Sequence, residues 1–165
     1  MILDKIAAYT RLRIEEAKKE LSPDEIRRLA LSCKTDTGFP FEKVLKEPGI
    51  HYICEVKKAS PSKGVIAEDF PYLKIAEEYE KAGASAISCL TEPKYFMGKN
   101  VYLKEITGKV KIPVLRKDFT VDPYMIYQAR KFGASAVLLI AAILTDEELK
   151  EYFRIAESLG LSCLF

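Results

Sequence analysis

Repeated glycines constrain the fold of this sequence more than any other feature. Four of them are spaced 25, 25 and 27 residues apart, and each follows a helical-looking segment and precedes a short apolar run: Gly83, Gly108, Gly133 and Gly160. Such a spacing suits one strand plus one helix. The middle runs are apolar on both faces, which is typical of parallel strands covered by helices. We therefore expect five strands with four helices between them, the strands at residues 52–57, 85–90, 111–115, 135–140 and 161–165.

Helix start signals agree with this pattern. Asp69 and Asp122 stand just before prolines that suit a first helical turn, and Thr145 with Glu148 forms a capping-box sequence. Apolar side chains then recur at helical spacing in each gap between the expected strands. The segment between Asn100 and the next glycine has fewer of these signals and is also predicted to be helical.

Residues 1–45 precede the repeat and have a different character. A charged amphipathic helix begins near Leu3, and a second helix opens at Ser22, where the sequence reads as a capping box with proline in the first turn. We therefore predict an N-terminal helical extension, residues 1–45, followed by a region of strands and helices, residues 46–165.

Alternating strands and helices allow two main architectures, an open doubly wound sheet and a (β/α)8 barrel. No G-x-G-x-x-G sequence follows the first expected strand, so the main argument for a dinucleotide-binding sheet is missing. We therefore predict an α/β fold of the (β/α)8 TIM-barrel family. Such barrels have eight units and about 250 residues, so residues 46–165 would form an incomplete barrel, its first half, with about four βα units and a fifth strand.

Composition and charge exclude several classes of function. The sequence has 26 Lys and Arg against 24 Asp and Glu, a balance that does not suit a dedicated nucleic-acid binder. Its single histidine and four scattered cysteines offer no metal-ligand spacing. The N-terminus lacks the apolar stretch of a signal peptide, and no apolar run approaches the roughly 18 residues of a membrane span. We expect a cytoplasmic protein with no nucleic-acid or membrane partner, which binds any anion at a local site.

The ends of the expected strands carry the residues that could do chemistry, because barrel active sites lie where strands end and loops begin. Alternation of side chains puts Glu55 and Lys57 on the same face of the first strand. The third strand ends with Lys117 and Asp118. Taken alone, the first pair could equally be a structural ion pair in the barrel interior, and the second would be an exposed strand-end pair.

Three collinear motifs at these strand ends resemble indole-3-glycerol phosphate synthase of tryptophan biosynthesis. They are EVKKASPSKG at residues 55–64, LTEPKYF at 90–96 and PVLRKDF at 113–119. The resemblance extends over essentially the whole chain, including the helical extension and the sequence GASAVLLI at 133–140. One such motif would be weak, but three in this order and spacing are specific.

The resemblance implies a carbon–carbon lyase without cofactor or metal, which closes the ring of 1-(2-carboxyphenylamino)-1-deoxyribulose 5-phosphate with loss of carbon dioxide and water. It implies that Lys117 is the general acid, helped by partial desolvation and by neighbouring cations. Glu55 would stabilise positive charge on the intermediate, and Lys57 would hold substrate anions and assist proton transfer. The substrate-binding residues implied in this way are Lys58, Ser60, Phe96, Phe119 and Leu138.

Plainer interpretations of the binding residues stay open. Ser60 would otherwise cap the turn at the proline that follows it. Phe96 and Phe119 would be ordinary core aromatics, and for Leu138 a core position is the better interpretation even within the family.

The sequence departs from the family at its C-terminal end. The resemblance puts the family's general base, a glutamate of the fifth strand, at the first position after Phe165, and the phosphate-binding loops of such barrels also lie beyond it. We therefore expect these residues alone to have little or no activity, and their open sheet edges to favour self-association or pairing with a C-terminal half-barrel. Two alternatives remain: a non-catalytic half-barrel that serves folding or assembly, and another sugar-phosphate barrel enzyme such as phosphoribosylanthranilate isomerase.

Overall fold

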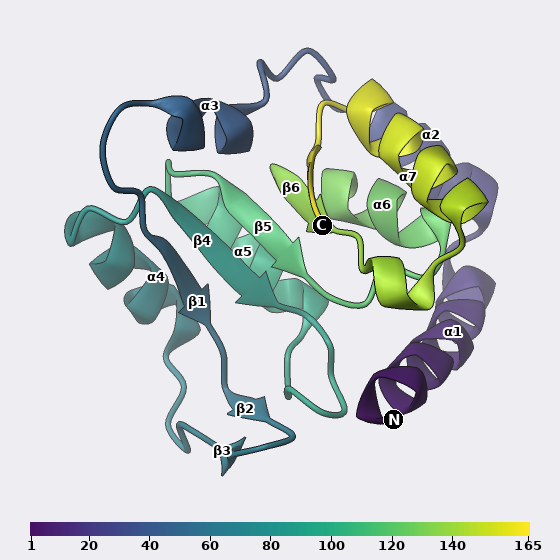
Figure 1. Cartoon of the computed structure of the whole chain (residues 1–165), viewed down its shortest axis with the longest axis horizontal. Coiled ribbons are helices and arrows are strands. Elements are labelled where there is room, and N and C mark those ends of the chain that lie inside the picture. The colour runs from purple at the N-terminus through teal and green to yellow at the C-terminus, as the bar shows by residue number, and fades with distance from the viewer.

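The computed structural model describes all residues, 1–165, as one parallel five-stranded sheet with helices packed against it (Figure 1). The strands lie in the order β1-β4-β5-β6-β7, so each strand pairs with the next one along the chain in the main sheet. This order, with a helix in each crossover, is that of a (β/α)8 barrel, and the predicted α/β incomplete barrel is confirmed. The strands of this sheet are β1 (Ile53–Val56), β4 (Ala86–Leu90), β5 (Val114–Lys117), β6 (Ala136–Leu138) and β7 (Ser162–Leu164).

Helices fill each gap between the strands, as the glycine spacing predicts. The capping signals are confirmed at Asp122, whose side chain accepts a hydrogen bond from the Tyr124 amide, and at Thr145, which forms a complete capping box. The same role was expected of Asp69, but this residue does not cap a helix. The next helix begins at Tyr72 with Pro71 as its N-cap, two residues beyond the position that Asp69 could cap. The crossover helices are α4 (Tyr72–Lys81), α5 (Asn100–Lys109), α6 (Pro123–Lys131) and α7 (Asp146–Ser158), and a short 3-10 helix, η1 (Ala141–Ile143), precedes α7.

Three helices precede the first strand: α1 (Ile2–Glu20), α2 (Pro23–Leu31) and α3 (Pro40–Lys46). The first two are those that the sequence predicts, although at Ser22 the capping box is only half formed, since the Glu25 carboxylate binds Arg28 instead. Figure 1 shows α1 near the carboxyl ends of the strands and α3 at the opposite end of the sheet.

The unpredicted helix α3 is held by tertiary contacts. Its Phe41 is buried among Ala86, Leu115 and Ala136, which are the inward-facing residues of β4, β5 and β6. A helix of seven residues is too short to be stable in water without packing. It is also too short to show an apolar period in the sequence, so α3 was not predicted. A small hairpin, β2 (Ala59–Ser60) with β3 (Gly64–Val65), was likewise not expected.

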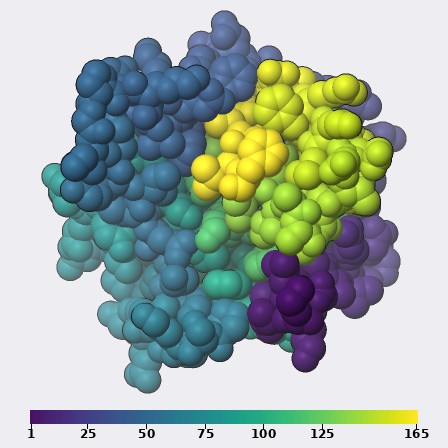
Figure 2. Space-filling model, in the orientation of Figure 1, coloured from purple at the N-terminus to yellow at the C-terminus, as the bar shows by residue number.

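Side-chain alternation divides the sheet into two faces. The outward face carries Ile87, Cys89, Val114 and Val137 into a large core shared with the crossover helices. The inward face carries Glu55 of β1 and Lys117 of β5, which point into what would be the barrel lumen. Figure 2 shows the molecule from this side, with the C-terminal residues in yellow near the middle and the N-terminal helix in purple against the yellow-green segment.

The chain lacks any helix whose length and apolar character together would let it cross a membrane. It also has no group of three or more His, Cys, Asp or Glu side chains arranged to hold a metal ion.

Candidate active site

One carboxylate lies between two ammonium groups at the carboxyl ends of β1 and β5. The Lys57 Nζ atom donates to Glu55 Oε1 at 2.6 Å, and the Lys117 Nζ atom donates to Glu55 Oε2 at 3.3 Å. From the intervening strand β4, the Ser88 hydroxyl lies 3.5 Å from the same Oε2 atom. The structure thus brings together the three residues implied as catalytic, and their side chains are each about one-third exposed.

The electrostatics of this cluster favour an ionised Glu55. Burial alone would raise the pKa of its carboxyl group, but the hydrogen bond from Lys57 and the charges of Lys117 and Lys57 outweigh burial and lower the pKa below its usual value. Glu55 is therefore a carboxylate at neutral pH. A carboxylate in this place can stabilise developing positive charge and can orient the Lys117 ammonium group as a proton donor.

An apolar hollow of about 200 Å³ opens beside this cluster. The predicted aromatic residues Phe96 and Phe119 face it together, with ring centroids 6.2 Å apart. The amphipathic helix α1 adds Leu3, whose place at the hollow has no local signal in the sequence. Six of the eight lining residues are hydrophobic, and the full set is Leu3, Leu90, Phe96, Lys117, Asp118, Phe119, Leu138 and Ile140.

Two of the predicted binding residues, Lys58 and Ser60, do not line this hollow. They lie on the loop and hairpin that follow β1, where the Ser60 hydroxyl accepts a hydrogen bond from the Lys63 amide at 3.3 Å. The Lys58 carbonyl accepts from the amides of Ile66 and Ala67. In this conformation Ser60 caps its turn, as the plainer interpretation of the sequence holds.

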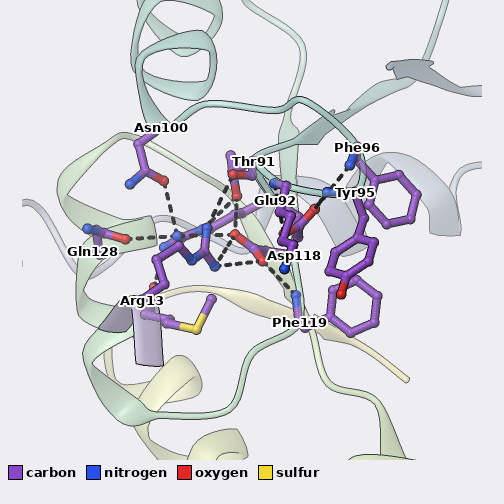
Figure 3. Close-up of polar contacts among 12 residues, drawn as sticks. Arg13, Thr91, Glu92, Tyr95, Phe96, Asn100, Asp118, Phe119 and Gln128 are labelled. Atoms are coloured by element: carbon purple, nitrogen blue, oxygen red, sulfur yellow. Dashed lines mark hydrogen bonds and ion pairs between the residues drawn. The ribbon is translucent and has the colours of Figure 1, made fainter. Parts of the chain in front are cut away.

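Asp118 is not part of an exposed strand-end pair, and that interpretation of the sequence is wrong. Its neighbour Lys117 faces the hollow, whereas the Asp118 carboxylate turns into the protein interior and is fully buried. The Arg13 guanidinium of α1 donates to both of its oxygens, at 2.9 and 3.0 Å, and the Thr91 hydroxyl donates at 2.6 Å (Figure 3). Burial opposes ionisation of Asp118, yet the charges of Arg13 and Arg116 and the hydrogen bond from Thr91 lower its pKa.

Arg116 supplies the second cation of this buried network. It lies on β5 next to Lys117 but faces outward, and it is 1% exposed. Its guanidinium donates to the Thr91 hydroxyl and the Met125 carbonyl, and reaches the Asn100 and Gln128 side chains at 3.1 and 2.8 Å. Burial lowers the pKa of Arg116 to about 10, so the group stays charged at neutral pH.

The comparisons with known proteins agree on one family. A sequence model described as indole-3-glycerol phosphate synthase matches residues 3–165. Proteins with that name from Ruminiclostridium cellulolyticum and Endomicrobium trichonymphae are each 56% identical over 164 residues, and the one from Lacticaseibacillus paracasei is 51% identical over the same length. Each match covers 99% of this chain and about 63% of the relative, so the chain spans less than two thirds of the proteins that it resembles.

Proposed function

Because this chain belongs to the indole-3-glycerol phosphate synthase family, we propose that it supplies the acid half of an active site that closes an indole ring. The substrate would be 1-(2-carboxyphenylamino)-1-deoxyribulose 5-phosphate, an anion that carries a carboxylate and a phosphate. One observation carries the proposal: the Lys117 ammonium group lines an apolar, aromatic-walled hollow and contacts the Glu55 carboxylate at 3.3 Å.

Each side chain at the site has a role in the proposed reaction. Lys117 protonates the substrate ketone as the aromatic ring carbon attacks it, and then regains a proton from solvent. After carbon dioxide has left, Lys117 protonates the hydroxyl that leaves as water, while a base supplied by other residues removes the proton of the adjacent carbon. Glu55 stabilises the iminium-like intermediate that precedes loss of carbon dioxide. Lys57, which shares the Glu55 carboxylate, holds a substrate anion and assists proton transfer. Phe96, Phe119 and Leu138 enclose the aromatic ring.

Lys58 and Ser60 enter the proposal as residues of the loop after β1. Because neither lines the hollow, we propose that they reach the substrate carboxylate only after this loop moves toward the site. Its residues 61–66 are exposed, and its backbone is tied down by few hydrogen bonds, which suits such a motion.

The groups present do not complete the chemistry. Apart from Lys117, Asp118 is the only ionisable residue that lines the hollow, and its carboxylate is already bound by two arginines and a threonine. A general base and a phosphate site would have to come from other residues. We therefore propose that residues 1–165 alone turn over slowly or not at all.

The edges of the sheet suggest how the other residues would be added. Strands β1 and β7 each have one unpaired edge, and apolar side chains near them are partly exposed, among them Ile53, Leu164 and Phe165. Exposed apolar strand edges promote association. We propose that they pair with a C-terminal half-barrel or with a second copy, and sedimentation that shows a compact monomer at high concentration would contradict this. Phosphoribosylanthranilate isomerase is not favoured as an alternative, because the matching family is the synthase.

The decisive experiment measures indole-3-glycerol phosphate formation by this chain, alone and mixed with a C-terminal portion of a family member. We expect no turnover alone, turnover on mixing, and loss of turnover in Lys117→Ala but not in the control Lys150→Ala, which removes an exposed lysine of α7. Turnover that survives Lys117→Ala would refute the assignment of the acid. Turnover by the chain alone, abolished by Lys117→Ala, would show that the base is already present.

A further inference from the structure

The loop between β4 and α5 presents Phe96 to the hollow, and one buried carboxylate organises it. Glu92 has no exposed surface, and no Lys or Arg side chain forms a salt bridge with it. Its two carboxylate oxygens instead accept the backbone amides of Lys94, Tyr95 and Phe96, at 3.1, 2.6 and 3.0 Å. Figure 3 shows Glu92 aimed at the backbone nitrogens of Tyr95 and Phe96.

The rest of this loop is held in a conformation that an unsupported chain would leave. Met97, next to Phe96, has φ at +53°, in the left-handed region that side chains other than those of glycine, asparagine and aspartate rarely adopt. The Gly98 amide donates to the Glu92 carbonyl at 2.7 Å, and a Cβ atom at Gly98 would lie 2.4 Å from the Leu90 carbonyl oxygen. Strained backbone of this kind persists only where the surroundings over-determine it.

Burying the polar oxygens of a carboxyl group costs free energy unless they find hydrogen-bond partners. Three converging amides provide them here, and in return the carboxylate fixes the backbone of three successive residues. The last of these is Phe96, whose ring is a wall of the hollow. Neither Glu55 nor Lys117 forms a hydrogen bond or a salt bridge with Glu92, so the polar contacts of the acid cluster do not include this interaction.

We propose that Glu92 is a positioning residue, which holds Phe96 as the aromatic wall against which the substrate ring binds. This inference rests on the proposed function for the identity of the substrate, but the link from Glu92 to Phe96 can be measured without it. Glu92 would act on binding of the aromatic ring, and not on proton transfer by Lys117. A carboxylate that served only the folding of the loop would not couple specifically to Phe96.

The first measurement follows the Phe96 ring directly. The chain contains eight phenylalanines, so it is labelled with 4-fluorophenylalanine, and the Phe96 signal in the ¹⁹F NMR spectrum is assigned with Phe96→Leu. We expect Glu92→Gln to shift or broaden this signal, because the amide NH₂ of glutamine faces a backbone N–H donor. The matched control Glu147→Gln alters an exposed glutamate of α7 and should leave the Phe96 signal unchanged.

The second measurement is binding of the proposed substrate, after reduction of its ketone to an alcohol that prevents ring closure, to this chain mixed with a C-terminal portion of a family member. We expect Glu92→Gln to raise the Kd by about 3- to 10-fold, the range of a weakened aromatic contact. In the Phe96→Leu background the same substitution should have no further effect. If Glu92→Gln does not fold, Glu92→Asp keeps the carboxyl group but shortens its reach to the three amides, and it should change the Phe96 signal in the same way.

The outcomes separate the two proposals. An unchanged Phe96 signal in a folded Glu92→Gln chain, or an equal rise in Kd with and without Phe96, would overturn the role of Glu92. Failure of the unaltered chain, mixed with a C-terminal portion of a family member, to bind the reduced substrate, with a Phe96 signal that still responds to Glu92→Gln, would refute the proposed substrate and support the Glu92–Phe96 link.

Discussion

Asp118→Asn should destabilise the folded chain, because it removes a buried charge that two arginines share. The change keeps the size of the side chain but removes the one negative charge that faces Arg13 and Arg116. Arg116 is 1% exposed and its pKa, about 10, keeps it charged at neutral pH, so its charge cannot be relieved by water or by loss of a proton. Arg13 is 17% exposed at its side chain and can be partly hydrated.

Removing one partner of a buried ion pair costs about 3–5 kcal/mol, because the other charge is left uncompensated. For a domain of this size each kcal/mol lowers the melting temperature by about 2–4 °C. We therefore expect Asp118→Asn to lose about 3–5 kcal/mol of unfolding free energy and to melt about 6–20 °C below the unaltered chain. Arg13→Met should lose less, and the two changes should be non-additive because both remove the same contact.

Urea unfolding followed by far-UV circular dichroism, with calorimetry for the melting temperature, measures these quantities. The matched control is Glu42→Gln, which breaks an exposed pair with Lys46 and should change the unfolding free energy by no more than about 0.5 kcal/mol. A loss below about 1 kcal/mol for Asp118→Asn would refute the reasoning, since it would mean that the Arg116 charge is compensated without the carboxylate.

Two further predictions concern acid and thiol chemistry. The pKa values of Asp118 and Glu55 are lowered in the folded chain, so the stability that these carboxylates contribute is present above their unfolded pKa values of about 4 and is lost as pH falls through the folded values. Urea unfolding at pH 7, 5 and 3 should therefore show a steep fall in the free energy of unfolding below about pH 4, and a smaller fall in Asp118→Asn. A free energy of unfolding that does not change with pH would contradict this. Burial raises the pKa of the Cys89 and Cys163 thiols to about 12. At pH 8 a disulfide reagent should therefore react with Cys33 and Cys54 well before it reacts with these two thiols. Rapid labelling of Cys89 in the folded chain would contradict the structure.

The repeat of strands and helices could be predicted because each signal is local. The glycine spacing, the apolar runs and the caps at Asp122 and Thr145 depend on residues close together in the chain, and the structure confirms them. The motifs at the strand ends also contain Lys117, Phe96 and Phe119, which the structure brings to one hollow, while their roles stay predictions. The predicted boundary between residues 1–45 and 46–165 stays a prediction.

The parts that could not be predicted depend on residues far apart in the chain. Helix α3 is stabilised because Phe41 packs between inward-facing residues of three strands, and no local sequence pattern predicts this packing. Arg13 reaches Asp118 across 105 positions, so its role was not visible in a helix that reads as charged and amphipathic. Leu3 likewise enters the hollow only through the packing of α1. For Asp118 a signal did exist, because alternation along the strand already separates it from Lys117.

That alternation explains how one short segment serves both stability and chemistry. Along the end of β5, Arg116 and Asp118 turn outward into a buried polar network, while Lys117 between them turns inward to the hollow. The network anchors the strand end to α1, α5 and α6 through Arg13, Asn100 and Gln128. The ammonium group that we propose as the acid is therefore carried by backbone that buried side chains on both sides anchor, while the Lys117 side chain itself reaches the hollow and the Glu55 carboxylate.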